Sequence, residues 1–151
     1  MRKKIIAVIG AGTADEAILK IAEDVGRLIA RRGAVLICGG LGGVMETASK
    51  GAKSAGGITV GILPQNHTKY ANPNIDIPIA TGFGEGRNII IARTADAIIA
   101  VGGEYGTLSE IAFGMKMGKP VIGIGTWDIK GTIKAKNAED AVEKAFELLS
   151  F

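Results

Sequence analysis

Short, strongly apolar segments recur along this chain, and amphipathic or polar stretches separate them. Near-continuous apolar character is typical of parallel strands that are covered on both faces. We predict a short strand around Thr132-Ile133 and six others, at residues 4–9, 34–38, 58–63, 75–80, 97–101 and 120–124. Strands that alternate with helices form a parallel sheet with right-handed crossovers. The expected fold class is α/β, a three-layer Rossmann-like fold with a central parallel sheet of six or seven strands flanked by helices.

Capping signals and apolar periodicity predict helices between these strands. Thr13 and Glu16 form a T-x-x-E capping box that predicts the start of the first helix, and Asn137 is the predicted cap of the last, amphipathic helix. The other predicted helices begin near Val44, run from Arg87 to about Thr94, and begin after Thr107 to end near Gly118.

Length and composition exclude several classes of function. A chain of 151 residues is expected to form one domain, residues 1–151. No apolar run approaches the ~20 residues of a membrane-spanning helix, so we expect no membrane partner and a cytoplasmic protein. The net charge of +3 comes without a basic stripe, which argues against nucleic-acid binding. His67 and Cys38 are the only residues of their types, so we predict no metal site, no internal disulfide and a core position for Cys38.

Glycine-rich loops follow the first, second, fourth and fifth predicted strands, at residues 10–12, 39–43, 81–86 and 102–106. In a parallel sheet these loops share one edge, where ligands bind near the point at which strand order reverses. Free amides at helix starts favour anions there. We therefore predict a site for a phosphorylated small molecule. Its candidate ligand-binding residues are Gly10, Gly12, Gly39, Gly40, Gly42, Gly43, Gly84, Gly102, Gly103, Tyr105, Gly106 and Thr107.

Two familiar nucleotide motifs are absent from these loops. Gly10-Ala11-Gly12 begins like G-x-G-x-x-G, but Asp15 occupies the third glycine position. Cys38 ends the second predicted strand, where a dinucleotide site places an acid for the ribose. No G-K-[ST] follows a suitably spaced glycine, so the pattern also argues against a P-loop.

Arg87 and Glu110 are the candidate catalytic residues, and each has a structural alternative. A cation in the first turn of a helix opposes the helix dipole, so Arg87 either grips ligand oxygens or pairs with Glu85. Thr107-Leu108-Ser109-Glu110 is itself a T-x-x-E capping box. Glu110 is therefore either a helix cap or a carboxylate at the floor of the site.

The segment from Arg87 to Glu110 resembles the signature of the LOG (Lonely Guy) and "lysine decarboxylase-like" superfamily. That signature joins an arginine-bearing helix start to a P-G-G-x-G-T-x-x-E loop. Here Gly103, Tyr105, Gly106, Thr107 and Glu110 fall on the loop pattern, and 39–45 is similar to the earlier glycine loop of the family. The resemblance adds Met45 and Asn88 to the candidate binding residues.

The resemblance implies a Rossmann-like fold, a homodimer or higher homo-oligomer, and a nucleoside monophosphate site. LOG members cleave the N-glycosidic bond of cytokinin riboside monophosphates, and their catalytic positions correspond to Arg87 and Glu110 here. The resemblance implies no required cofactor. The run Ile89-Ile90-Ile91-Ala92 also favours self-association, because one face of a surface helix cannot bury all four residues.

This sequence departs from the LOG pattern at three positions. Gly102 replaces proline, Glu104 replaces the second glycine, and Ser109 replaces the first glutamate. Its form is more similar to a sister branch that includes the molybdenum cofactor carrier protein of algae, which implies a phosphorylated pterin as bound ligand. Two hypotheses therefore remain open. The first is a protein that binds a nucleotide or molybdopterin-type cofactor, as a carrier or sensor or as an enzyme of unassigned substrate. The second is a nucleoside 5'-monophosphate phosphoribohydrolase.

Overall fold

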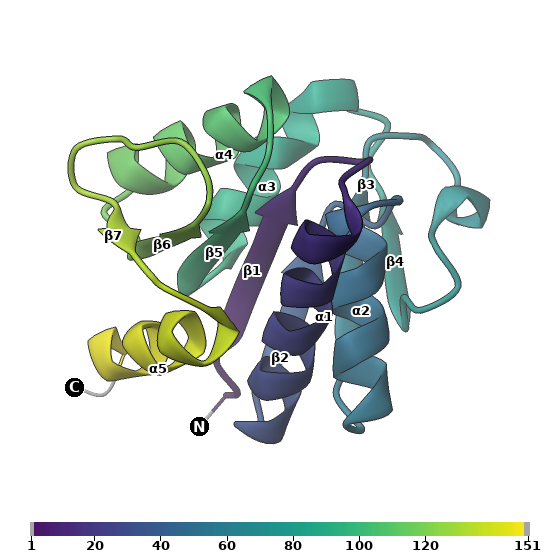
Figure 1. Cartoon of the computed structure of the whole chain (residues 1–151). Coiled ribbons are helices and arrows are strands. Elements are labelled where there is room, and N and C mark those ends of the chain that lie inside the picture. Colours follow the sequence, from purple (N-terminus) through teal and green to yellow (C-terminus); the bar gives the residue numbers. More distant parts are fainter. Residues whose placement is uncertain (1, 150–151) are drawn as a thin grey trace.

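A central parallel sheet carries the architecture of this computed structural model, which describes residues 2–149 (Figure 1). Seven strands in this range are ordered β4-β3-β2-β1-β5-β6-β7. Their bounds are β1 Ile5–Gly10, β2 Val35–Cys38, β3 Thr59–Leu63, β4 Ile77–Ala80, β5 Ala97–Val101, β6 Val121–Ile124 and β7 Ile133–Lys134. The helices are α1 Glu16–Arg31, α2 Val44–Ser54, α3 Arg87–Thr94, α4 Tyr105–Lys116 and α5 Ala138–Leu148, with 3-10 turns η1 Thr68–Tyr70 and η2 Gly84–Gly86. The predicted fold class is confirmed.

The helices cover the two faces of the sheet as separate layers. Figure 1 shows α1, α2 and α5 in front of the sheet and α3 and α4 behind it. Alternation along β1 matches this arrangement. Ile6 and Val8 pack into the core with α1, α2 and α5, whereas Ala7 and Ile9 pack into the core with α3 and α4. Burial on both faces explains why β1 and β5 are apolar along their whole length.

Strand order reverses between β1 and β5. The chain builds β1, β2, β3 and β4 in one direction, and then returns through α3 to place β5 on the other side of β1. Parallel pairs such as Gly10↔Val101 bring the ends of β1 and β5 together. The loops that follow these two strands must diverge to opposite faces, which opens a crevice at this edge.

Two predicted capping boxes are wrong. Asp15, rather than Thr13, caps α1, and its side chain accepts a hydrogen bond from Ile18 N at 2.9 Å. A carboxylate is the better cap, because it also interacts favourably with the helix dipole. Helix α4 begins at Tyr105, with Glu104 at the N-cap, so Thr107 lies inside its first turn. The predicted cap of α5 is confirmed, since Asn137 accepts from Asp140 N at 2.8 Å.

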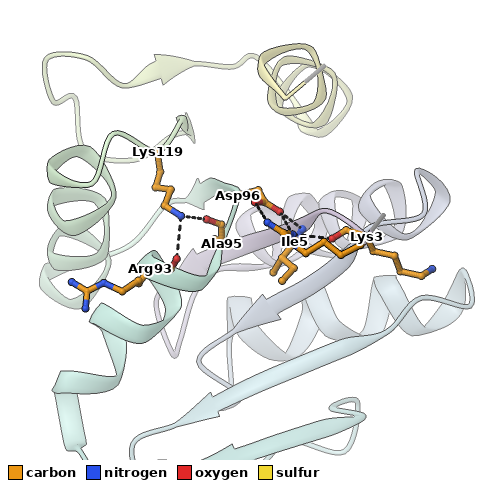
Figure 2. Close-up of polar contacts among 7 residues, drawn as sticks. Lys3, Ile5, Arg93, Ala95, Asp96 and Lys119 are labelled. Atoms are coloured by element: carbon orange, nitrogen blue, oxygen red, sulfur yellow. Dashed lines mark hydrogen bonds and ion pairs between the residues drawn. The ribbon is translucent and has the colours of Figure 1, made fainter. Parts of the chain in front are cut away.

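The opposite edge of the sheet is held by polar contacts (Figure 2). The Asp96 carboxylate accepts from Ile5 N at 2.8 Å and pairs with Arg2 at 2.8 Å. The hydrogen bond from Arg2 lowers the pKa of Asp96 to about 2. Lys119 Nζ donates to the carbonyl oxygens of Arg93 and Ala95 at 3.0 and 2.6 Å. These contacts hold the connection between α3 and β5 in place.

Cys38 is fully buried in the core, as predicted. None of the helices within residues 2–149 has both the length and the apolar character needed to cross a bilayer.

Candidate functional site

A cavity of about 440 Å³ lies at the crevice between β1 and β5. It is bordered by the end of β1, the loop that follows β1, the end of β2, and the starts of α2, α3 and α4. Its lining residues are Val8, Ile9, Gly10, Ala11, Gly12, Thr13, Gly39, Met45, Glu85, Arg87, Asn88, Glu104, Gly106, Thr107 and Glu110. Segments that are far apart in the sequence therefore meet in one hollow at the edge predicted for a ligand.

The structure brings many of the predicted site residues together in this cavity. Those in the lining are Gly10, Gly12, Gly39, Met45, Arg87, Asn88, Gly106, Thr107 and Glu110. The others lie in the same loops but outside the lining: Gly40, Gly42, Gly43, Gly84, Gly102, Gly103 and Tyr105. Most of these residues are glycines with positive φ, which allow the loops to turn sharply. Gly103, for example, has φ +108°, and a Cβ there would clash with the Thr107 side chain.

Arg87 is buried at the start of α3, with 8% of its surface exposed. Its Nε donates to the carbonyl oxygen of Ile62 at 3.0 Å, and its Nη1 donates to Asn88 Oδ1. The alternative pairing with Glu85 is therefore not what holds this guanidinium. Among the described residues these two bonds leave Nη2 without a partner, so a strong fixed donor remains available to a ligand.

Gly39 makes room for this arginine at the end of β2. A Cβ on Gly39 would lie 2.6 Å from Arg87 Nη2 and 2.7 Å from Met45 Sδ. Any side chain there would displace the guanidinium or the thioether. The glycine thus lets Arg87 lie against the backbone of β2, close to the start of α2.

Asn88 and Ser109 connect α3 with α4. Asn88 Nδ2 donates to Ser109 Oγ at 3.2 Å, and Ser109 Oγ donates to the carbonyl oxygen of Gly106 at 2.6 Å. Since Asn88 also accepts from Arg87, a continuous chain of hydrogen bonds links the guanidinium to the first turn of α4. The two helix starts that border the cavity are held in one relative position.

Glu110 lies in the second turn of α4 and lines the floor of the cavity. Only 7% of its surface is exposed, and burial raises the pKa of this carboxyl to about 8. The nearby positive charge of Arg87 lowers the pKa, and the negative charge of Glu85 raises it. The predicted alternative, a cap on the Thr107 amide, is wrong because the helix begins two residues before Thr107. Glu110 is instead a buried acid that is largely protonated at neutral pH.

The start of α4 combines free amides with a carboxylate. The carbonyl oxygen of Glu104 accepts from Leu108 N at 2.9 Å and from Trp127 Nε1 at 3.0 Å, which fixes the N-cap. The Tyr105 and Trp127 rings also pack, with centroids 5.7 Å apart. The amides of Gly106 and Thr107 precede the first helical hydrogen bond, so they have no partner within the helix. Glu104 and Glu85 also line the cavity, although neither is among the residues predicted to bind the ligand. An acid inside a glycine loop is a signal that the sequence shows.

No group of three His, Cys, Asp or Glu side chains within residues 2–149 is arranged to hold a metal ion. The cavity therefore offers hydrogen-bond donors, one buried guanidinium and separate carboxyl groups. This set suits an anion that has a polar organic group attached to it.

A model of the SLOG cluster4 family matches residues 3–148. The chain belongs to the SLOG cluster4 family. That assignment confirms the predicted resemblance to the LOG and "lysine decarboxylase-like" proteins. Within this range lie the glycine loops, Arg87 and Glu110, so the SLOG cluster4 match covers the whole cavity.

Two solved structures resemble this SLOG cluster4 chain over nearly its full length. The molybdenum cofactor binding protein of Rippkaea orientalis is 41% identical, with a TM-score of 0.94 and coverage of 99% of both chains. The molybdenum cofactor carrier protein of Chlamydomonas reinhardtii is 37% identical, with a TM-score of 0.92 and coverage of 99% of this chain and 100% of that one.

A relative that is an enzyme matches a smaller part of this chain. The cytokinin riboside 5'-monophosphate phosphoribohydrolase of Mycobacterium tuberculosis is 32% identical over 120 residues. The match covers 73% of this chain and 64% of the enzyme, so this SLOG cluster4 chain spans less than two thirds of its length.

Proposed function

We propose that the cavity binds a phosphorylated small molecule, a molybdopterin-type cofactor or a nucleotide, and that the protein acts as its carrier or sensor. The observation that carries this proposal is the buried Arg87 guanidinium, whose Nη2 has no partner among the described residues and lies beside Gly39, in a cavity that both residues line. A fixed arginine at a water-poor site is an effective binder of phosphate oxygens.

The phosphate is placed at the β2 end of the cavity in this proposal. Arg87 and the start of α2, where Met45 lines the wall, lie together at this end. The first amides of a helix favour a negative charge. A protonated Glu110 adds no opposing charge and can donate a hydrogen bond to a ligand oxygen. This donor set fits the terminal phosphate of a nucleotide or of molybdopterin.

Two observations favour a carrier or sensor over an enzyme. The molybdenum cofactor proteins match 99% of this chain, whereas the phosphoribohydrolase matches 73%. In addition, Glu104 and Ser109 replace the second glycine and the first glutamate of the LOG loop. Glu104 is the N-cap of α4, and Ser109 lies within this helix, which borders the cavity.

A second candidate function is hydrolysis of the N-glycosidic bond of a nucleoside monophosphate, and Glu110 favours it. A carboxyl group with a pKa of about 8 is suited to general acid chemistry at neutral pH. In this reaction Glu110 donates its proton to the leaving base as the bond between C1' and nitrogen breaks. Water then adds to C1' and returns a proton, while Arg87 holds the ribose phosphate.

Thermal unfolding in the presence of AMP, GMP and the matching nucleosides tests the proposal. A ligand at about one hundred times its Kd should stabilise the protein by about 2.7 kcal/mol. We expect the monophosphates to raise the Tm and the nucleosides to leave it unchanged. Arg87→Met should abolish the shift, whereas Arg31→Met, a control in the last turn of α1, should retain it.

Chromatography of the same mixtures separates the two candidate functions. A carrier or sensor leaves the nucleotides intact, and a phosphoribohydrolase releases free base in a Glu110-dependent manner. Equal stabilisation by nucleosides and nucleotides would contradict a phosphate site. Failure of every nucleotide, and of molybdopterin itself, to bind would overturn the proposed function.

A further inference from the structure

We propose that Asn72 is a positioning residue for ligand binding, which holds the glycine loop 39–43 in the conformation that leaves room for the Arg87 guanidinium. Asn72 belongs to the β3–β4 loop, residues 64–76. The inference rests on the proposed function, in which Arg87 binds the phosphate of the ligand.

The β3–β4 loop lies at the same edge of the sheet as the glycine-rich loops, because it follows the carboxyl end of a parallel strand. None of its residues, all of which the structure describes, lines the cavity. The loop is nevertheless bonded to segments that do border the cavity. Near its start, the carbonyl oxygen of Pro64 accepts from Gly84 N at 3.0 Å, three residues before Arg87.

Asn72 connects the later part of the β3–β4 loop to the glycine loop 39–43. Only 9% of its surface is exposed. Its main-chain N donates to the carbonyl oxygen of Gly40 at 2.9 Å, and its side-chain Nδ2 donates to that of Leu41 at 2.8 Å. Its Oδ1 accepts from Asn74 N at 2.9 Å. Because both ends of the side-chain amide have a partner, the orientation of the amide is fixed.

The glycine loop 39–43 needs contacts of this kind. Four of its five residues are glycines, which have no side chain to pack and lose more conformational freedom on ordering than other residues. Gly40, for example, has φ +78°. At the α2 end of the loop, Val44 N donates to the carbonyl oxygen of Ala11 at 3.1 Å. Asn72 supplies the two hydrogen bonds that hold the β2 end from outside the loop.

Gly39 transmits the position of this loop to the guanidinium. A Cβ on Gly39 would be 2.6 Å from Arg87 Nη2, so the loop and the guanidinium have little space between them. Arg87 is itself fixed from β3, through the carbonyl oxygen of Ile62. The space around Nη2 therefore depends on how firmly Gly40 and Leu41 are held. Release of these two residues from Asn72 should move the loop relative to Nη2 and weaken ligand binding.

Calorimetric titration of Asn72→Ala and Asn72→Asp with AMP and GMP tests the inference. Asn72→Asp keeps the size of the side chain, but its carboxylate has no donor for the carbonyl oxygen of Leu41. At a pH of about 8, we expect both variants to bind nucleotides about tenfold more weakly than the unmodified protein, the effect of losing about one buried hydrogen bond.

A pH profile separates the lost donor from other effects of the substitution. A protonated carboxyl group can donate and accept like an amide, and burial favours this form. Lowering the pH from about 8 to about 5 should therefore return the affinity of Asn72→Asp toward that of the unmodified protein at the same pH. Asn72→Ala has no such group, so its affinity should stay about tenfold lower throughout.

Two variants serve as controls, and both should retain the affinity of the unmodified protein. Asn74→Ala is the matched control in the same loop, because Asn74 contacts Asn72 and Thr59 through its main-chain N and O, which alanine keeps. Asp96→Ala controls for lost stability, since it leaves Ile5 N without its acceptor at the opposite edge of the sheet.

The single cysteine provides a measurement that needs no ligand. Cys38 is fully buried at the end of β2, and Gly40 N donates to its Sγ at 3.4 Å. Local opening of the glycine loop exposes this thiol to a thiol reagent. Under native conditions, we expect Cys38 to react about tenfold faster in Asn72→Ala than in Asp96→Ala, because only the first loses contacts of this loop.

Several results would overturn the inference while leaving nucleotide binding in place. They are an unchanged affinity in both Asn72 variants, an equal loss of affinity in either control, no return of affinity in Asn72→Asp at low pH, and equal reaction rates of Cys38 in Asn72→Ala and Asp96→Ala. Asn72→Ser provides a further variant if Asn72→Ala does not fold. No binding of any nucleotide by the unmodified protein would overturn the proposed function together with the inference.

Discussion

The guanidinium of Arg87 lies directly against Gly39, so closely that a Cβ on Gly39 would be 2.6 Å from Nη2. Gly39 directly follows β2 and Arg87 begins α3, and α2, β3 and β4 lie between them in the sequence. The contact explains why a large charged side chain is buried at a helix start where the dipole opposes it. Its position is fixed by the carbonyl oxygen of Ile62 and by Asn88.

Gly39→Ala should therefore displace Arg87 and weaken nucleotide binding. We expect a loss of about 1–3 kcal/mol in the free energy of unfolding, which is typical of overpacking. The matched control is Gly86→Ala, where φ is −62° and the nearest atom would be an ordinary 3.5 Å away. Urea unfolding and nucleotide titration of the two variants provide the comparison. Unchanged binding in Gly39→Ala would show that Arg87 does not need this position.

Glu110 should make the stability of the protein depend on pH. Burial raises its pKa from 4.5 to about 8, so the folded protein holds a proton that the unfolded chain releases between these values. The free energy of unfolding should therefore fall as pH rises from 4.5 to about 8, and then level off, by a few kcal/mol in order of magnitude. Urea unfolding across this range should show the fall in the unmodified protein and a flatter profile in Glu110→Gln. Parallel profiles would contradict a buried, protonated Glu110.

Asp96 should have the opposite dependence on pH. The hydrogen bond from Arg2 lowers its pKa from 3.8 to about 2, so its contribution is present above the ordinary pKa and is lost as pH falls toward 2. Asp96→Ala leaves Ile5 N without its acceptor and should cost about 1–3 kcal/mol at neutral pH. Arg2→Ala removes only a largely exposed partner and should cost less than about 1 kcal/mol. Since both lie at the far edge of the sheet, Arg2→Ala should leave nucleotide affinity unchanged, and equal costs of the two variants would count against this assignment.

Self-association remains a prediction. Ile89 and Ile90 in α3 are only half-buried, and Phe83, just before α3, is 66% exposed. A second copy of the chain would cover such apolar surface. Light scattering at micromolar concentration is expected to give a dimer or a larger homo-oligomer. The mass of a monomer at that concentration would refute the prediction.

The strands and the position of the site could be predicted from the sequence because their signals are local. The apolar run at β5 and the helix at α3 appear with the predicted bounds, since continuous burial leaves a continuous apolar run. The helix starts predicted at Thr13 and Thr107 were wrong, because T-x-x-E is a short pattern that also occurs away from helix caps. Asp15 and Glu104, at neighbouring positions, are the N-caps of these helices instead.

The inner geometry of the site could not be predicted, because it depends on tertiary contacts. The partners of Arg87 are a β3 carbonyl oxygen and the neighbouring Asn88, and no spacing rule connects Arg87 with Ile62. The pKa of Glu110 is raised by burial, which depends on the folded chain around it, whereas the sequence pattern favoured a cap. The position of Glu104 in the lining could not be predicted either. Whether an acid in a glycine loop lines a cavity depends on where the following helix begins.

A crystal structure of the protein with GMP would test the central claim most directly. We expect the phosphate at the β2 end of the cavity, with an oxygen about 3 Å from Arg87 Nη2. A phosphate bound elsewhere on the molecule, with Arg87 Nη2 left without a ligand contact, would contradict the account.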